Sequence, residues 1–260
     1  MTLLEALILG IVQGATEFLP ISSSGHLVLV EELLKVHVGL ILEVTLHAGT
    51  LLAVAIYFRR RLAWMATSAL REDQEGRRAR VWILWLALAT LPAVAVGLGF
   101  KSGIEAVFES RRWALWGLIA TGVVIFSTFR LRSRGRSAIG PAGLVMGIAQ
   151  AVAILPGVSR SGTTIAAGMW CGVDRSEAAE FSFLLSLPAI AGAMLLQAFE
   201  VGAAGGVPSG LLAGLVVGLL GAFLSGYAAI AGLLEVLRRR GLHPFAWYCW
   251  AVGLAGLILI

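Results

Sequence analysis

Four apolar runs, each about the length that a helix needs to cross a lipid bilayer, most constrain what this chain can fold into. These runs are residues 81–100, 113–129, 177–199 and 209–237. A hydrocarbon core of roughly 30 Å requires about 20 mostly apolar residues in a helical segment. Two further runs of similar length, 38–58 and 243–260, bring the expected number of transmembrane helices to six. The sequence therefore predicts an all-α, polytopic membrane protein.

The composition agrees with a protein whose surroundings are mostly lipid. Hydrophobic residues make up 58% of the 260 positions and charged residues only 13%, whereas soluble domains carry about 25% charged residues. The formal charge of +5 comes from arginines in short clusters between apolar runs. That pattern indicates topology, so we expect membrane lipids and no nucleic acid as partners. The two cysteines, Cys171 and Cys249, are too isolated for a metal site or a disulfide framework.

Three arginine clusters predict which loops lie inside the cell, because basic residues are retained on the cytoplasmic side of short loops. The clusters are residues 59–80 with seven arginines, 130–136 with four and 238–240 with three. The loops 101–112 and 200–208 carry little or no net positive charge. We therefore expect these two loops outside.

Two segments must then return to the side from which they enter. Residues 140–173 begin and end on the cytoplasmic side, whereas residues 1–35 begin and end outside, so that both termini are expected to be external. The polar centres at 156–164 and 20–26 do not suit a lipid-facing helix, because backbone freed from helical bonding must be buried in protein or line a wet cavity. We therefore expect two re-entrant helical hairpins that approach from opposite faces.

The two hairpins align with each other at a single ungapped offset of 137 residues. Polar and glycine positions are among the matches, and they coincide less readily by composition than apolar ones. The matches are Gly10 with Gly147, Ile11 with Ile148, Gln13 with Gln150, Ser22 with Ser159, Ser24 with Ser161, Gly25 with Gly162, and Glu43 with Glu180. We expect one membrane domain, 1–260, with an inverted repeat of 1–136 and 137–260, an architecture that places polar sites near the bilayer midplane.

The candidate site residues lie where this repeat is broken. The mismatched pairs are Glu17 with Ile154, Ser23 with Arg160, and His26 with Thr163. One tip thus carries a carboxylate and an imidazole, and the other a guanidinium. Arg160, flanked by hydroxyls and glycine amides at a helix start, suits phosphate oxygens, and the alternative is a structural ion pair with Glu17 or Glu180. The hydroxyls expected to bind the same anion are those of Ser22, Ser24, Ser159, Ser161 and Thr164.

Four side chains of the first hairpin carry the candidate chemistry. Gln13 and Glu17 lie four residues apart, so on a helix they face one way and can share a divalent cation through their oxygens. The alternative for Glu17 is neutralisation by burial or pairing with an arginine. His26 suits proton transfer near neutral pH, or is simply a hydrogen-bonded residue. Ser23 is either a nucleophile or a hydroxyl that closes the turn.

The sequence contains two strings that resemble the signature motifs of the bacterial undecaprenyl-diphosphatase family, the bacitracin-resistance type: residues 13–26 (QGATEFLPISSSGH) and 156–164 (PGVSRSGTT). The run 180–188 (EFSFLLSLP) is similar to that family as well, and the resemblance extends over essentially the whole chain. It implies hydrolysis of undecaprenyl diphosphate to undecaprenyl phosphate and inorganic phosphate in the bacterial inner (plasma) membrane. The product serves again as the carrier of peptidoglycan precursors, and the activity gives bacitracin resistance.

The resemblance also implies a cofactor and roles for the motif residues. Such enzymes need a divalent cation, magnesium or calcium, and Gln13 and Glu17 belong to the motif that would hold it. Gln13 stands where the family also uses Glu, and His47 stands where we expect Gln in some relatives. The attacking group is Ser23 or a water molecule in its place. The catalytic residues that we expect are Glu17, Ser23, His26 and Arg160.

A second class of function fits the same architecture. Inverted repeats with midplane sites are also typical of secondary transporters, so a transporter or a lipid flippase is the alternative to a phosphatase. Release of inorganic phosphate from a long-chain isoprenyl diphosphate, abolished by EDTA, distinguishes the two classes. The glycine-rich stretch 214–226 permits close helix contacts and hence a homodimer. The resemblance favours a site that opens to the outer face of the membrane.

Overall fold

The computed structural model describes residues 2–36, 39–100, 103, 107, 110–203 and 209–259. Within these ranges the chain is all-helical and contains no strand, so the prediction of an all-α protein is confirmed. The first residue of the run 38–58 lies outside the described residues, as do parts of the two loops that we expect outside, 101–112 and 200–208.

The described helices follow the apolar runs and the two polar motifs. In the first half of the chain they are α1 (Leu3–Phe18), α2 (Ser23–Leu34), α3 (Leu40–Tyr57), α4 (Arg59–Ser68), α5 (Gln74–Gly99) and α7 (Arg111–Phe126). In the second half they are α8 (Pro141–Val152), α9 (Arg160–Trp170), α10 (Arg175–Ala203), the short turn η1 (Ser209–Leu211), α11 (Leu212–Arg239) and α12 (His243–Leu259). Local signals fix several of their starts. Thr2 and Glu5 form a capping box at α1, and the Asp73 carboxylate accepts a 2.9 Å hydrogen bond from the Gly76 amide at α5.

Among the described helices, α3, α5, α10 and α11 are long and apolar enough to cross a membrane. Helices α7 and α12 are shorter, with 16 and 17 residues. Many large apolar side chains of these helices remain exposed, including Leu98 of α5, Leu195 of α10 and Leu224 of α11. An exposed apolar surface of this kind suits a lipid environment. The chain is therefore a membrane protein.

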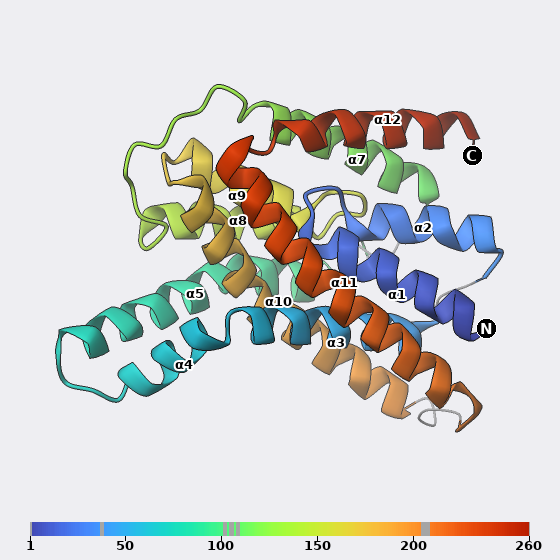
Figure 1. Cartoon of the computed structure of the whole chain (residues 1–260), viewed down its shortest axis with the longest axis horizontal. Helices are drawn as coiled ribbons and strands as arrows, with labels where there is room; N and C mark the ends of the chain where they lie inside the picture. Colours follow the sequence, from blue (N-terminus) through green and yellow to red (C-terminus); the bar gives the residue numbers. More distant parts are fainter. Residues whose placement is uncertain are drawn as a thin grey trace.

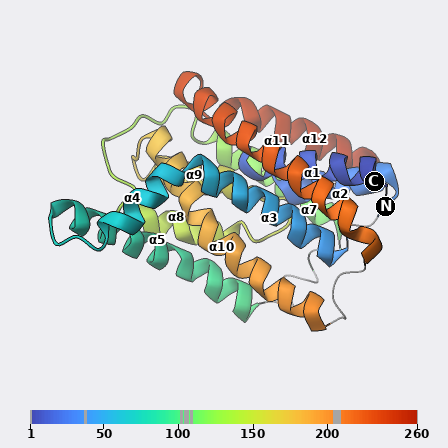
Figure 2. The same cartoon turned by 60° about the horizontal axis from the view of Figure 1, so that its bottom comes forward.

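Two helical hairpins, α1–α2 and α8–α9, enter the molecule from opposite ends and bring their tips together near its middle (Figure 1). The N-terminus and the C-terminus lie at the same end, beside α1 and α12 (Figure 1). Helix α4 and the first turns of α5 lie side by side at the other end, as both views show (Figures 1 and 2). This arrangement brings the polar centres of the two motifs together in the interior.

Each hairpin packs against a long helix from the other half of the chain. Helix α1 lies along α11, and α8 lies along α5. At Gly10 a Cβ atom would collide with the carbonyl oxygen of Gly218, and at Gly147 it would collide with that of Ala89. Helices approach this closely only where the contact positions are small. Glycines of the stretch 214–226, which we considered for a homodimer, contact α1 of the same chain.

We predict that Gly147→Ala destabilises the protein by about 1–3 kcal/mol, because the new methyl group meets the backbone of α5, which cannot move aside as a flexible side chain would. The matched control is Gly232→Ala in α11, where a Cβ atom has nothing within 4 Å. The measurement is the thermal unfolding midpoint of each purified variant in the same detergent. Equal midpoints for the two variants would contradict the close contact between α8 and α5.

Candidate active site

The tip of the first hairpin is a tight turn that ends α1 and starts α2. Helix α1 ends at Phe18, and Pro20 follows, which cannot donate a helical hydrogen bond. Ser22 then caps α2, with its hydroxyl accepting a 3.4 Å hydrogen bond from the Gly25 amide. Its backbone φ is 65°, a left-handed conformation that non-glycine residues adopt at a cost. The turn thereby places Ser23 at the first position of α2.

The tip of the second hairpin has a similar turn, and helix α7 packs against it. Gly157 has φ of 79°, and a Cβ atom there would collide with the carbonyl oxygen of Ala114 in α7. Ser159 caps α9 by accepting a 3.1 Å hydrogen bond from the Gly162 amide. Its own amide donates to Oγ1 of Thr121 at 2.9 Å. Arg160 consequently occupies the first position of α9.

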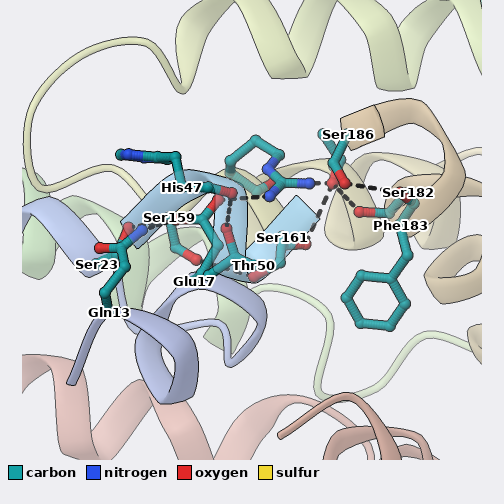
Figure 3. Close-up of polar contacts among 12 residues, drawn as sticks. Gln13, Glu17, Ser23, His47, Thr50, Ser159, Ser161, Ser182, Phe183 and Ser186 are labelled. Carbon is teal, nitrogen blue, oxygen red and sulfur yellow. Dashed lines mark hydrogen bonds and ion pairs between the residues drawn. The ribbon is translucent and has the colours of Figure 1, made fainter. Parts of the chain in front are cut away.

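The carboxylate of Glu17 is the centre where the two tips meet. Its Oε1 accepts a 2.6 Å hydrogen bond from Nη2 of Arg160. Its Oε2 accepts from the Ser23 hydroxyl at 2.7 Å and from Nε2 of Gln13 at 3.0 Å. In Figure 3, Gln13, Glu17 and Ser23 lie in one polar cluster with Ser159 and Ser161 from the second tip. The structure thus brings together Gln13, Glu17, Ser23 and Arg160 from three helices, α1, α2 and α9.

The ion pair between Glu17 and Arg160 is largely shielded from solvent. The side chain of Arg160 is 14% exposed and that of Glu17 is 9% exposed. Two polar atoms of this cluster, Nη1 of Arg160 and Oε1 of Gln13, are buried without a hydrogen-bond partner among the described residues. Native structures leave few buried polar groups unsatisfied, and such groups mark places where a water, an ion or a ligand binds. The cluster therefore offers one donor and one acceptor to a ligand.

The oxygen atoms of this cluster are too few to complete the coordination shell of a hard divalent cation, so a bound ligand would have to add further oxygens. No group of three or more His, Cys, Asp or Glu side chains is close enough to bind a metal within the described part of the chain. Glu17 offers one carboxylate, and Gln13 offers its unpartnered amide oxygen. Magnesium commonly binds one or two carboxylates and completes its shell with water and substrate phosphates. Gln13 and Glu17 fit a cation of that kind.

His26 is not hydrogen-bonded into the cluster of Glu17, Ser23 and Arg160 among the described residues and contacts Tyr248 instead. Its Nδ1 lies 2.8 Å from the carbonyl oxygen of Ser22, and its Nε2 lies 2.8 Å from the hydroxyl of Tyr248 in α12. The two rings also stack, with centroids 5.5 Å apart. Because a carbonyl only accepts, Nδ1 carries a proton, and in the neutral ring Nε2 then accepts from Tyr248. No hydrogen bond joins His26 to the other three catalytic candidates over the residues that the structure describes.

The motif hydroxyls mostly connect the two tips. Ser24 accepts a 3.1 Å hydrogen bond from the Gly157 amide and lies 3.2 Å from the Ser22 hydroxyl. Ser161 donates to the carbonyl oxygen of Leu19 at 3.2 Å. Ser159 and Ser161 hydroxyls lie 3.3 Å apart. Four of the expected anion ligands are therefore at the crossing of the hairpins, namely Ser22, Ser24, Ser159 and Ser161.

Thr164 was also expected to bind the anion, but its hydroxyl is occupied by other contacts. Its hydroxyl is fully buried, donates to the carbonyl oxygen of Arg160 at 2.8 Å, and lies 2.6 Å from the hydroxyl of Ser182 in α10. Glu180 also turns away from the cluster and forms a 2.9 Å ion pair with Arg61 of α4. Of the two partners that we considered for Arg160, the structure selects Glu17.

Two residues of this region were not identified from the sequence. Tyr248 lies in an apolar run that carried no polar motif, and Thr121 lies in a run that we interpreted only as a transmembrane helix. Thr121 is fully buried and donates to the Gly157 carbonyl at 3.1 Å while accepting from the Ser159 amide. No sequence pattern distinguishes either residue from its neighbours, because each acts on a segment distant along the chain.

Comparison with known proteins connects this geometry to a family. The model of the family described as "Bacitracin resistance protein BacA" matches residues 6–255. A protein of Syntrophotalea carbinolica named undecaprenyl-diphosphatase is 41% identical over 97% of this chain and 97% of its own length. A protein of Methanobrevibacter smithii named undecaprenyl-diphosphatase is 39% identical over 98% of this chain and 96% of its own length. A protein of Bacillus thuringiensis subsp. konkukian named undecaprenyl-diphosphatase 4 is 40% identical over 100% of this chain and 98% of its own length. The chain therefore belongs to the BacA family of bacitracin resistance proteins.

Proposed function

We propose that this protein is a membrane phosphatase that hydrolyses undecaprenyl diphosphate to undecaprenyl phosphate and inorganic phosphate. The observation that carries the proposal is the buried Nη1 of Arg160, which has no hydrogen-bond partner among the described residues and lies beside Glu17 where two hairpin tips meet. A phosphate oxygen supplies the partner that this guanidinium lacks. The names of the relatives point to the same reaction. The activity would return the lipid carrier to peptidoglycan synthesis and so give bacitracin resistance.

The hydrogen bonds of the cluster suggest how the attacking group is activated. The Ser23 hydroxyl donates to Glu17 at 2.7 Å, a distance at which a carboxylate can take the proton of a nucleophile. Ser23 Oγ would then form a bond to the terminal phosphorus while the bond to the bridging oxygen breaks. A water molecule would hydrolyse the phosphoserine and release inorganic phosphate. Arg160 would neutralise the non-bridging oxygens, which carry the charge in phosphoryl transfer.

His26 and the metal have supporting places in this proposal. His26 contacts Tyr248 instead of Ser23, so it would assist a proton transfer other than that of the serine, such as one from the hydrolytic water through the Tyr248 hydroxyl. Gln13 and Glu17 would hold magnesium or calcium, and such an ion would add positive charge next to the phosphate oxygens. Ser22, Ser24, Ser159 and Ser161 would hold the tips in register around the diphosphate.

The proposed membrane arrangement has six transmembrane helices and two re-entrant hairpins, formed by inverted repeats 1–136 and 137–260. Helix starts support it, because α8, α9 and α11 begin 138, 137 and 138 residues after α1, α2 and α5. The opposed hairpins in Figure 1 support it as well. We place the protein in the bacterial inner membrane with the arginine clusters inside, and with the two termini, which share one end of the molecule, outside. The family resemblance favours a site that opens to the outer face.

The direct test is phosphate release by purified protein in detergent from a long-chain isoprenyl diphosphate. We expect inorganic phosphate and the isoprenyl monophosphate in equal amounts. EDTA should abolish the release, and added magnesium or calcium should restore it, because Glu17 and the amide of Gln13 form an incomplete oxygen site. Absence of phosphate release with metal present would exclude the phosphatase and favour a transporter. Full activity in EDTA would contradict the metal requirement but would leave the phosphatase reaction standing.

Exchange of the central guanidinium tests the anion site. We expect Arg160→Lys to lower kcat/KM roughly 100-fold to 1000-fold, because an ammonium group lacks the planar fork with which the guanidinium bonds Glu17 through Nη2 and still directs Nη1 at a phosphate oxygen. The matched control is Arg239→Lys in α11, where the arginine is exposed and paired with Glu235. Steady-state kinetics of both variants provide the comparison. Similar kinetics for Arg160→Lys and the control would leave Arg160 as a structural residue only.

Removal of the serine hydroxyl tests the covalent route. We expect Ser23→Ala to lose at least about 1000-fold in kcat and to form no phosphoserine when it is quenched in acid with ³²P-labelled substrate. The control is Ser225→Ala in α11, whose hydroxyl donates to the carbonyl oxygen of Gly221 in its own helix. A rate for Ser23→Ala near that of the wild type would assign the attack to water activated by Glu17.

A further inference from the structure

A cavity of about 780 Å³ lies between α4 and α5, at the end of the molecule opposite to the two termini. We call it the α4–α5 basic pocket and define it by six of its lining residues: Arg60, Arg61, Trp64, Arg77, Arg78 and Trp82. None of these residues belongs to the cluster around Glu17. Neither the family match nor the names of the relatives assigns a role to this pocket.

Two of the four arginines in the pocket are not neutralised by the protein. Arg78 forms a 2.9 Å ion pair with Glu75, and Arg61 forms a 2.9 Å ion pair with Glu180. Arg60 and Arg77 have no ion-pair partner within residues 2–36, 39–100, 103, 107, 110–203 and 209–259. The pocket therefore presents at least two uncompensated positive charges to an anion.

Aromatic contacts hold the wall of the pocket in place. The guanidinium carbon of Arg61 lies 4.6 Å from the ring centroid of Trp64 and 4.2 Å from that of Trp82, so that both indoles pack on one cation. The indole Nε1 of Trp64 also donates to Glu75 at 3.1 Å. A freely solvated basic loop lacks such contacts. The pocket is thus ordered before a ligand arrives, which lowers the entropic cost of binding.

The pocket lies at the level where the polar part of α5 gives way to its apolar part. Residues 74–80 of α5 include three arginines, and the apolar run begins at Val81. Val81, Trp82 and Ile139 add apolar side chains to the lining of the pocket, beside its arginines. Tryptophans concentrate at the boundary between hydrocarbon and headgroups. A ligand that carries a phosphate above an apolar body would contact both the arginines and these apolar side chains, whereas free phosphate would contact only the arginines.

We propose that the α4–α5 basic pocket binds the headgroup phosphate of an anionic membrane phospholipid. Clusters of arginines directly at the cytoplasmic end of a transmembrane helix, as at the start of α5, bind such headgroups, and each arginine near the membrane surface strengthens the attraction. The lipid would fix α4 against α5 at the proposed cytoplasmic surface. This role is independent of the phosphatase reaction, so it stands or fails separately from that proposal.

The test is native mass spectrometry of the full-length protein, released from detergent micelles that contain equal amounts of phosphatidylglycerol and phosphatidylcholine. We expect the wild type to retain one phosphatidylglycerol in preference to phosphatidylcholine. The double variant Arg60→Gln/Arg77→Gln should bind phosphatidylglycerol roughly 30-fold more weakly, the effect of removing two arginines at a membrane surface. Both side chains are exposed and unpaired among the described residues, so the exchange leaves the fold intact.

The matched control is Arg130→Gln/Arg132→Gln, which removes two arginines from another cluster that does not line the pocket. This control should retain phosphatidylglycerol as the wild type does. Equal retention of the two lipids by the wild type, or an equal loss in both double variants, would overturn the proposal. Displacement of the bound lipid by millimolar inorganic phosphate would also overturn it, because the pocket would then recognise the anion without the lipid.

Discussion

The ion pair between Glu17 and Arg160 is the interaction on which the rest of the interior depends. Each charge alone would be costly in a low-dielectric environment, and removal of one partner from a buried pair costs about 3–5 kcal/mol. The pair connects residues 143 positions apart, so it also fixes how the two hairpins meet. Glu17 still accepts from Ser23 and Gln13, while Nη1 of Arg160 has no hydrogen-bond partner among the residues that the structure describes. One contact therefore both connects the two hairpin tips and leaves a buried donor of Arg160 available to a ligand.

Packing between the two halves of the chain fixes the geometry of the ion pair between Glu17 and Arg160. Helix α1 packs on α11 and α8 packs on α5, so neither hairpin is supported only by its own half. Gly10 and Gly147 allow backbone to approach backbone there, and dispersion between closely packed helices replaces the hydrophobic driving force that lipid does not provide. The tips are then positioned by rigid helices and not by flexible loops. Such support is what a site needs if its polar atoms must hold their geometry.

The hydroxyl-rich motifs have a structural role beside the proposed chemical one. Ser22 and Ser159 cap α2 and α9, and Ser24 and Ser161 each bond the backbone of the opposite tip. Backbone released from helical bonding in a membrane must find partners, and these hydroxyls provide them. The same residue types were expected to bind phosphate. Their present contacts show that satisfying the turn backbone is the first requirement that they meet.

The apolar runs, the arginine clusters and the polar centres at 20–26 and 156–164 were enough to predict an all-α membrane protein with its polar residues in two helical hairpins. These features are local, because hydropathy and turn chemistry act over neighbouring residues. The residues Gln13, Glu17, Ser23 and Arg160 were selected in the same way. Their partners could not be selected from the sequence. Both Glu17 and Glu180 remained possible partners of Arg160. No sequence pattern linked His26 to Tyr248 or Ser159 to Thr121. Those contacts join segments from 38 to 222 residues apart, and they exist only because helix packing sets the distance between them.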